Sequence, residues 1–138
     1  MFIKEKTMDI RKTDYYYKTL REDDLCDCDY CKNYYKEIKA AYPLLAEYLE
    51  GIGVDIEKPF EAMPLEPYEG YIEYMAVQYV VMGDPSDFEE TDVADVHVCI
   101  AESHPMTDIA EPHFVIELYP VTLKWTMDTD RNQKEKIQ

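Results

Sequence analysis

Apolar positions along this chain follow two different periods, and the change of period separates a helical part from a strand-rich part. From Cys31 to Ile52, apolar residues recur at spacings of three and four, the period of one face of an α-helix. Pro43 interrupts this stripe without shifting its phase, and a proline inside a helix removes a backbone donor. The pattern therefore predicts either one helix kinked at Pro43 or two short, nearly collinear helices.

Strand-like patterns dominate the second half of the chain, where β-branched and aromatic residues are frequent. They occupy residues 70–82, 96–101, 113–119 and 121–127. In the first of these segments both alternating sets are mostly apolar, which predicts a strand covered on both faces. If Leu118 points inward, strict alternation would point Val121 outward, although Val121 begins the next inward-facing apolar set. We therefore expect a bulge or bend near Tyr119-Pro120.

A run of three tyrosines, Tyr15 to Tyr17, predicts one further strand near the N-terminus. The connections between the later strands are too short for parallel crossovers. The sequence therefore predicts an α+β fold in two layers. A mostly antiparallel sheet of four to six strands carries one kinked helix, or two short helices, on one face. We expect residues 1–127 to form a single domain and the polar residues 128–138 to form a frayed tail.

The 138 residues carry a net charge of −16, and the excess is not evenly distributed. Residues 1–60 hold 10 Lys and Arg against 13 Asp and Glu, whereas residues 59–123 hold 14 Asp and Glu and no Lys or Arg. Such a surface argues against direct nucleic-acid binding, which depends on cations that displace phosphate counterions. The favoured explanation of this charge is solubility in a crowded cytosol, and the alternative is a docking face for a basic protein partner or a mimic of nucleic acid.

The N-terminal residues are charged and show no apolar core of a secretory signal, and the longest apolar stretch is too short for a membrane-spanning helix. We therefore expect a cytoplasmic protein that binds no membrane. In a reducing cytoplasm the four cysteines are thiols or metal ligands and not disulfides. The oligomeric state is not specified by the sequence.

Three cysteines, Cys26, Cys28 and Cys31, stand at the predicted start of the helix. Thiolates are preferred zinc ligands, and a structural zinc site has four ligands, so one more residue is needed. His97 and Cys99, which share one face of a predicted strand, are the candidate fourth ligands. Zinc is therefore the one cofactor that the sequence suggests, and no catalytic or other cofactor-binding residue stands out.

Two other interpretations of the cysteines remain open. Cys31 lies on the apolar stripe, and free cysteines are often simply buried in the core. Cys28 and Cys31 also have the spacing of a redox pair at a helix start, although Asp27 and Asp29 oppose thiolate formation there.

The run "CDCDYCKNYY", together with "YPLLAEYLEGIGVDIEKPFE" and "SHPMTDIAEPHFVIELYPVTLKW", resembles an uncharacterised family of small bacterial proteins. The shared signature is Cys-x-Cys-x-x-Cys-x-Asn-Tyr/Phe, and the resemblance spans roughly residues 25–126, with the cysteine signature as its most specific part. It implies a single bacterial cytosolic domain and brings no activity, substrate or cofactor.

The sequence does not specify a biochemical function. It shows no convincing nucleophile–base pair and no phosphate-binding glycine loop. The favoured interpretation is a non-enzymatic acidic interaction domain with a small structural metal site. The alternative is a metal- or thiol-dependent enzyme or sensor that uses the cysteine cluster.

Overall fold

The computed structural model describes residues 7–127, so the expected tail at 128–138 lies outside the described residues. The helices are α1 (Ile10–Thr19), α2 (Asp29–Ala41) and α3 (Pro43–Gly51), with short 3-10 turns at Glu22–Asp24 and Pro85–Asp87. The strands are β1 (Glu61–Pro64), β2 (Tyr71–Met82), β3 (Thr91–Val93), β4 (Val96–Ile100), β5 (His113–Tyr119) and β6 (Val121–Lys124). The α+β fold predicted from the sequence is confirmed.

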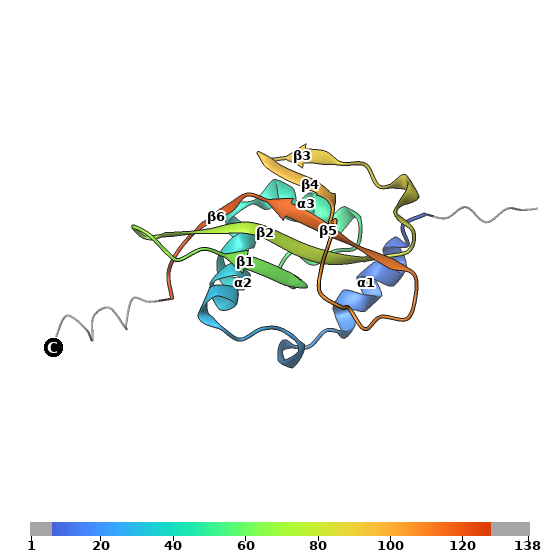
Figure 1. Ribbon diagram of the computed structural model, residues 1–138, viewed down its shortest axis with the longest axis horizontal. Coiled ribbons are helices and arrows are strands. Elements are labelled where there is room, and N and C mark those ends of the chain that lie inside the picture. The colour runs from blue at the N-terminus through green and yellow to red at the C-terminus, as the bar shows by residue number, and fades with distance from the viewer. Residues whose placement is uncertain (1–6, 128–138) are drawn as a thin grey trace, which may run out of the picture.

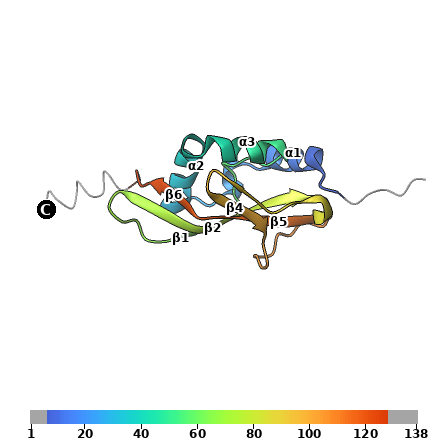
Figure 2. The same ribbon diagram turned by 90° about the horizontal axis from the view of Figure 1, so that it is seen from above.

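The long strand β2 lies at the centre of one six-stranded antiparallel sheet (Figure 1). On one side β2 pairs with β1, and on the other it pairs first with β6 and then with β5. The strands β4 and β3 continue the sheet beyond β5. The three helices lie together against one face of this sheet, as the view from above shows (Figure 2).

The two prolines act as the sequence predicted. Helix α2 ends at Ala41, its C-cap residue Tyr42 has a φ of −131°, and Pro43 then begins α3 at the position where a missing N–H has no cost. The two-helix alternative is therefore the one observed. The strand region 113–124 is broken at Pro120, so that β5 pairs with Val77–Met82 and β6 with Tyr71–Tyr74 of the same strand.

The predicted strand at Tyr15 to Tyr17 is wrong, because these residues lie in α1. The Asp9 side chain caps this helix by accepting from the Lys12 N–H at 3.0 Å. Thr13 and Tyr17, four residues apart, form its buried face, whereas Tyr15 is 70% exposed. Capping and a helical burial pattern outweigh the weak strand preference of a tyrosine run.

The edge strands β1 and β3 were not predicted. Strand β1 falls in the stretch 54–70, which contains three prolines, and β3 falls at the end of the acidic stretch 84–92. Each has only three or four residues, too few for an alternating pattern to be recognised. Among residues 7–127, no helix combines the length and the apolar character needed to cross a bilayer.

Helix α1 is fixed to the sheet by polar contacts as well as by apolar packing. The Tyr17 hydroxyl donates to the Val80 carbonyl at 2.7 Å, and the Met82 N–H donates to the Thr13 hydroxyl at 2.9 Å. Both contacts are buried, so water could not replace the hydrogen-bond partner of the Val80 carbonyl or of the Met82 N–H.

We predict that Tyr17→Phe lowers the free energy of unfolding by about 1–2 kcal/mol, because it leaves the buried Val80 carbonyl without its donor. Tyr15→Phe removes the same atom from an exposed ring and should change stability by less than about 0.5 kcal/mol. Urea denaturation of the two variants measures the difference, and equal stabilities would contradict the α1 placement.

Candidate metal centre

The candidate site lies where the connection after α1 enters α2. Cys28 is the N-cap residue of α2, and its sulfur accepts a hydrogen bond from the Cys31 N–H at 3.4 Å. An N-cap side chain satisfies a backbone N–H that has no partner within the helix. The capping thus brings the Cys28 sulfur back over the first turn, the turn that carries Cys31.

Helix α2 is held in place by buried polar contacts to the sheet. The Asn33 side chain is fully buried, donates to the Lys124 carbonyl at 2.8 Å and accepts from the Thr126 N–H at 2.9 Å. The Tyr74 hydroxyl of β2 donates to the Tyr30 carbonyl at 2.6 Å. These contacts fix the first turn of α2, and with it the sulfur of Cys31, relative to the sheet.

The three sulfur atoms of Cys26, Cys28 and Cys31 lie within 4.8 Å of one another. The sulfurs of Cys26 and Cys28 are 3.3 Å apart. Zinc–sulfur bonds of about 2.3 Å at tetrahedral angles place two sulfurs about 3.8 Å apart. The observed cluster therefore has the size that a single thiophilic metal ion requires of three ligands, with only small side-chain adjustments.

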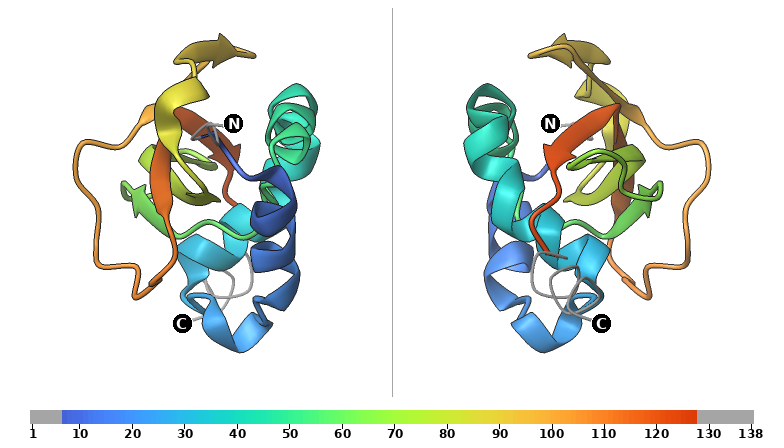
Figure 3. Two further views of the ribbon diagram at one scale, coloured as in Figure 1. Left: turned by 90° about the vertical axis from the view of Figure 1, so that its right-hand side faces the viewer. Right: turned by 90° about the vertical axis from the view of Figure 1, so that its left-hand side faces the viewer.

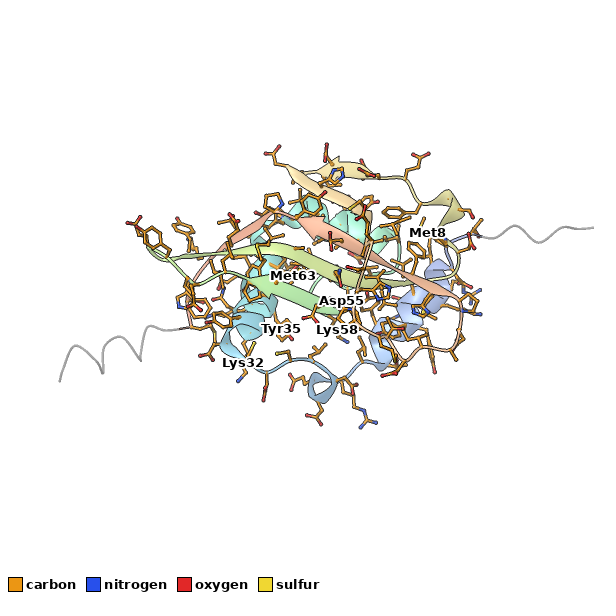
Figure 4. All side chains as sticks on the ribbon, in the orientation of Figure 1. Met8, Lys32, Tyr35, Asp55, Lys58 and Met63 are labelled. Carbon is orange, nitrogen blue, oxygen red and sulfur yellow. The ribbon has the colours of Figure 1, made fainter. Side chains whose placement is uncertain are left out.

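Exposure separates the cluster from an ordinary group of core cysteines. Cys26 and Cys28 are exposed and Cys31 is half-buried, so burial in the core does not account for the first two. The Tyr35 hydroxyl, one helical turn after Cys31, donates to the Cys26 carbonyl at 2.8 Å. Tyr35 and Lys32 lie on α2 above the connection, where they line a hollow of about 330 Å³ that also contains Cys26 (Figure 4).

The thiols differ in their readiness to ionise. Hydrogen bonds from the backbone and the side chain of Cys28 lower the pKa of the Cys26 thiol, although the Asp27 carboxylate opposes this. Burial raises the pKa of Cys31, and its neighbouring sulfurs raise it further. Several thiolates can therefore coexist here only with a cation that offsets their mutual repulsion.

The two candidate fourth ligands, His97 and Cys99, lie on β4 and do not belong to the three-thiol cluster of the described residues. The His97 ring contacts Asp92 through Nδ1 at 2.7 Å and Glu90 through Nε2 at 2.6 Å. Both ring nitrogens are thus already engaged by carboxylates. The structure therefore brings together three of the five sequence-predicted ligand residues.

Sequence reasoning missed Asn33 and Tyr35, which position the site without supplying a sulfur. Both carry a recognisable signal. Asn33 is a polar residue among the buried positions of an amphipathic helix, and Tyr35 follows Cys31 at the i+4 spacing that places two side chains on one face.

Comparison of the chain with known protein families, with curated proteins and with solved structures finds no significant match. Of the resemblance described above, the structure supports only the proximity of Cys26, Cys28 and Cys31. The site is therefore interpreted from its own geometry.

We predict a raised pKa for His97, because hydrogen bonds to Asp92 and Glu90 favour the imidazolium form. Since the folded-state pKa exceeds the unfolded value, this contribution to stability is complete below about pH 6.5 and is lost as the pH rises through the folded-state pKa. An NMR titration of the ring measures the value. In the Asp92→Asn/Glu90→Gln variant the pKa should fall, and an unchanged value would contradict this assignment.

Proposed function

We propose that the protein is a non-catalytic, acidic interaction domain that binds one zinc ion through Cys26, Cys28 and Cys31. The close approach of the three sulfurs is the observation that carries the metal assignment. Zinc suits this ligand set because thiolates select soft or borderline-soft ions and discriminate against magnesium and calcium.

The metal's role follows from where its ligands lie. Cys26 and Cys28 belong to the connection after α1, whereas Cys31 lies inside α2. An ion shared by all three would tie the connection to the helix, a segment where exposed side chains give little apolar packing. Zinc here would supply stability rather than chemistry.

The distribution of carboxylates supports an interaction domain rather than an enzyme. Of the 14 Asp and Glu between residues 59 and 123, 11 are exposed, and the remaining three, Glu61, Asp84 and Glu117, are half-buried. The hollows around the helices are lined instead by residues between Asp14 and Phe60. Most acidic groups of the second half thus lie on open surface, where a partner could reach them.

A thiol-dependent sensor is the second candidate, and the 3.3 Å separation of the Cys26 and Cys28 sulfurs favours it. A small-molecule disulfide could accept the two electrons released as these two thiols lose their protons and form one disulfide bond. The lowered pKa of Cys26 makes it the attacking group. Metal bound to the same sulfurs would block this reaction.

We predict about one zinc ion per chain in protein purified without chelator. Serine at Cys26 or Cys28 should abolish retention of the metal, while Cys99→Ser, outside the cluster, should retain it. Elemental mass spectrometry of the folded variants measures the content. Loss of zinc in Cys99→Ser would instead make Cys99 the fourth ligand and contradict the placement of β4 away from the site.

For the sensor, we predict that metal-free protein incubated with oxidised glutathione forms an internal disulfide between Cys26 and Cys28. Peptide mapping after alkylation of the remaining thiols identifies the pair. Cys31→Ser should still form the bond, because Cys31 takes no part in it. If neither the zinc-loaded nor the metal-free wild-type protein forms this disulfide, the sensor proposal is wrong. The zinc site is then the better assignment.

A further inference from the structure

Other parts of the chain cover only part of the sheet face that lies opposite the helices. The segment 101–112 crosses this face beside β4 and β5, on the side away from the helices (Figure 3). Beneath it, Val80, Met82 and Val115 form a second, small apolar cluster with the partly buried Phe60 and Ile109. Only the second half of β2 is therefore covered on both faces.

The first half of β2 leaves large apolar side chains open on this same face. Ile72 and Tyr74 point into the main core, while Tyr71 and Met75 alternate with them and are 54% and 53% exposed. In a strand this alternation places the exposed pair on the face away from the helices.

Two residues of the hairpin between β1 and β2 extend this surface. Tyr68 forms an antiparallel bridge with Tyr71, and the Leu65 N–H donates to the Glu73 carbonyl at 2.8 Å. Residues paired across antiparallel strands have their side chains on one face. The hairpin face, defined as Leu65, Tyr68, Tyr71 and Met75, thus gathers four apolar side chains that are 42% to 75% exposed around Glu73, which lies between Tyr71 and Met75 on the same strand face.

Charges around the hairpin face are almost all negative. Glu61, Glu69 and Glu73 belong to the same two strands and their turn, whereas Glu66 accepts from the Tyr30 hydroxyl of α2 at 3.0 Å. Within residues 7–127, strand pairing places the cation Lys124 of β6 opposite Tyr71. An apolar surface bordered by carboxylates is complementary to a partner that presents apolar side chains flanked by Lys or Arg.

We propose that the hairpin face docks a basic amphipathic helix of a partner protein. The opposite face of the same sheet already packs against amphipathic helices, so a helix has the shape that this sheet accepts (Figure 2). A second copy of this chain fits poorly, because it would bring the same glutamates against one another. The inference rests on the proposed role as an interaction domain but is independent of the metal.

The test uses zinc-loaded, full-length protein and a fluorescein-labelled peptide of Leu and Lys with Leu at helical i, i+3, i+4 and i+7 positions. Fluorescence anisotropy measures its dissociation constant. The double variant Tyr71→Ser/Met75→Ser should weaken binding about tenfold, since two contacts of about 0.7 kcal/mol each are lost. The matched control is Tyr15→Ser/Leu44→Ser, which removes an exposed tyrosine and an exposed aliphatic side chain, 70% and 62% exposed, from the helical layer.

Three results would overturn the proposal. Equal dissociation constants for the double variant and its control would show that peptide binding depends on net charge alone. Equal affinity for a Leu and Glu peptide would remove the role of the carboxylates. A wild-type dimer in sedimentation, dissociated by Tyr71→Ser/Met75→Ser, would assign the face to a second copy. Zinc content measured on the same samples separates a failed docking face from a failed metal site.

Discussion

A hydroxyl group that leaves water must find a partner inside the protein, and several tyrosines here find theirs in the opposite layer. Tyr34 of α2 meets the hydroxyl of Tyr79 on β2, and Tyr79 donates to the Ile56 carbonyl after α3. Tyr17 of α1 and Tyr74 of β2 make the corresponding contacts to carbonyl groups of the other layer. Burial raises the pKa of all four, so they remain protonated donors. The helices therefore have one favoured placement on the sheet, because any shift would leave a buried polar group unpaired.

This fixed placement is what makes the cysteine cluster a candidate metal site. The cap at Cys28 sets the first turn of α2, and the contacts of Asn33 hold that turn against the end of β6. Tyr35 then restrains the connection by binding the Cys26 carbonyl. Rigid support from the helix and the sheet on one side, and exposed thiols on the other, is an arrangement that favours metal binding over simple packing.

The charge distribution and the incomplete cover of the sheet concern the same half of the chain. The first half provides the helices, most of the cations and the three thiols, whereas the second half provides the sheet and the uncompensated carboxylates. The proposed metal site and the proposed docking surface, the hairpin face, thus lie on different parts of one framework. Loss of one need not impair the other, which permits their separate tests.

The sequence by itself determined whatever depends on neighbours along the chain. Helical spacing from Cys31 onward, the break at Pro43, the alternating strands and the change of parity at Pro120 are local patterns, and the structure has each of them. The proximity of three cysteines within six positions is local in the same sense. The tyrosines of α1 misled this reasoning because their strand preference is small compared with the free energy of burying Tyr17.

Only the tertiary structure decided which distant residues meet. The short strands β1 and β3 exist because longer neighbours offer them hydrogen bonds, so their own few residues carry no periodic signal. Likewise, the sequence predicts that His97 and Cys99 share one face of a strand, which made both of them candidate ligands. Whether β4 lies near the start of α2 depends on the order of the strands in the sheet. Strand order follows from packing the whole core, a sum over contacts between residues far apart in sequence, and no local pattern encodes such a sum.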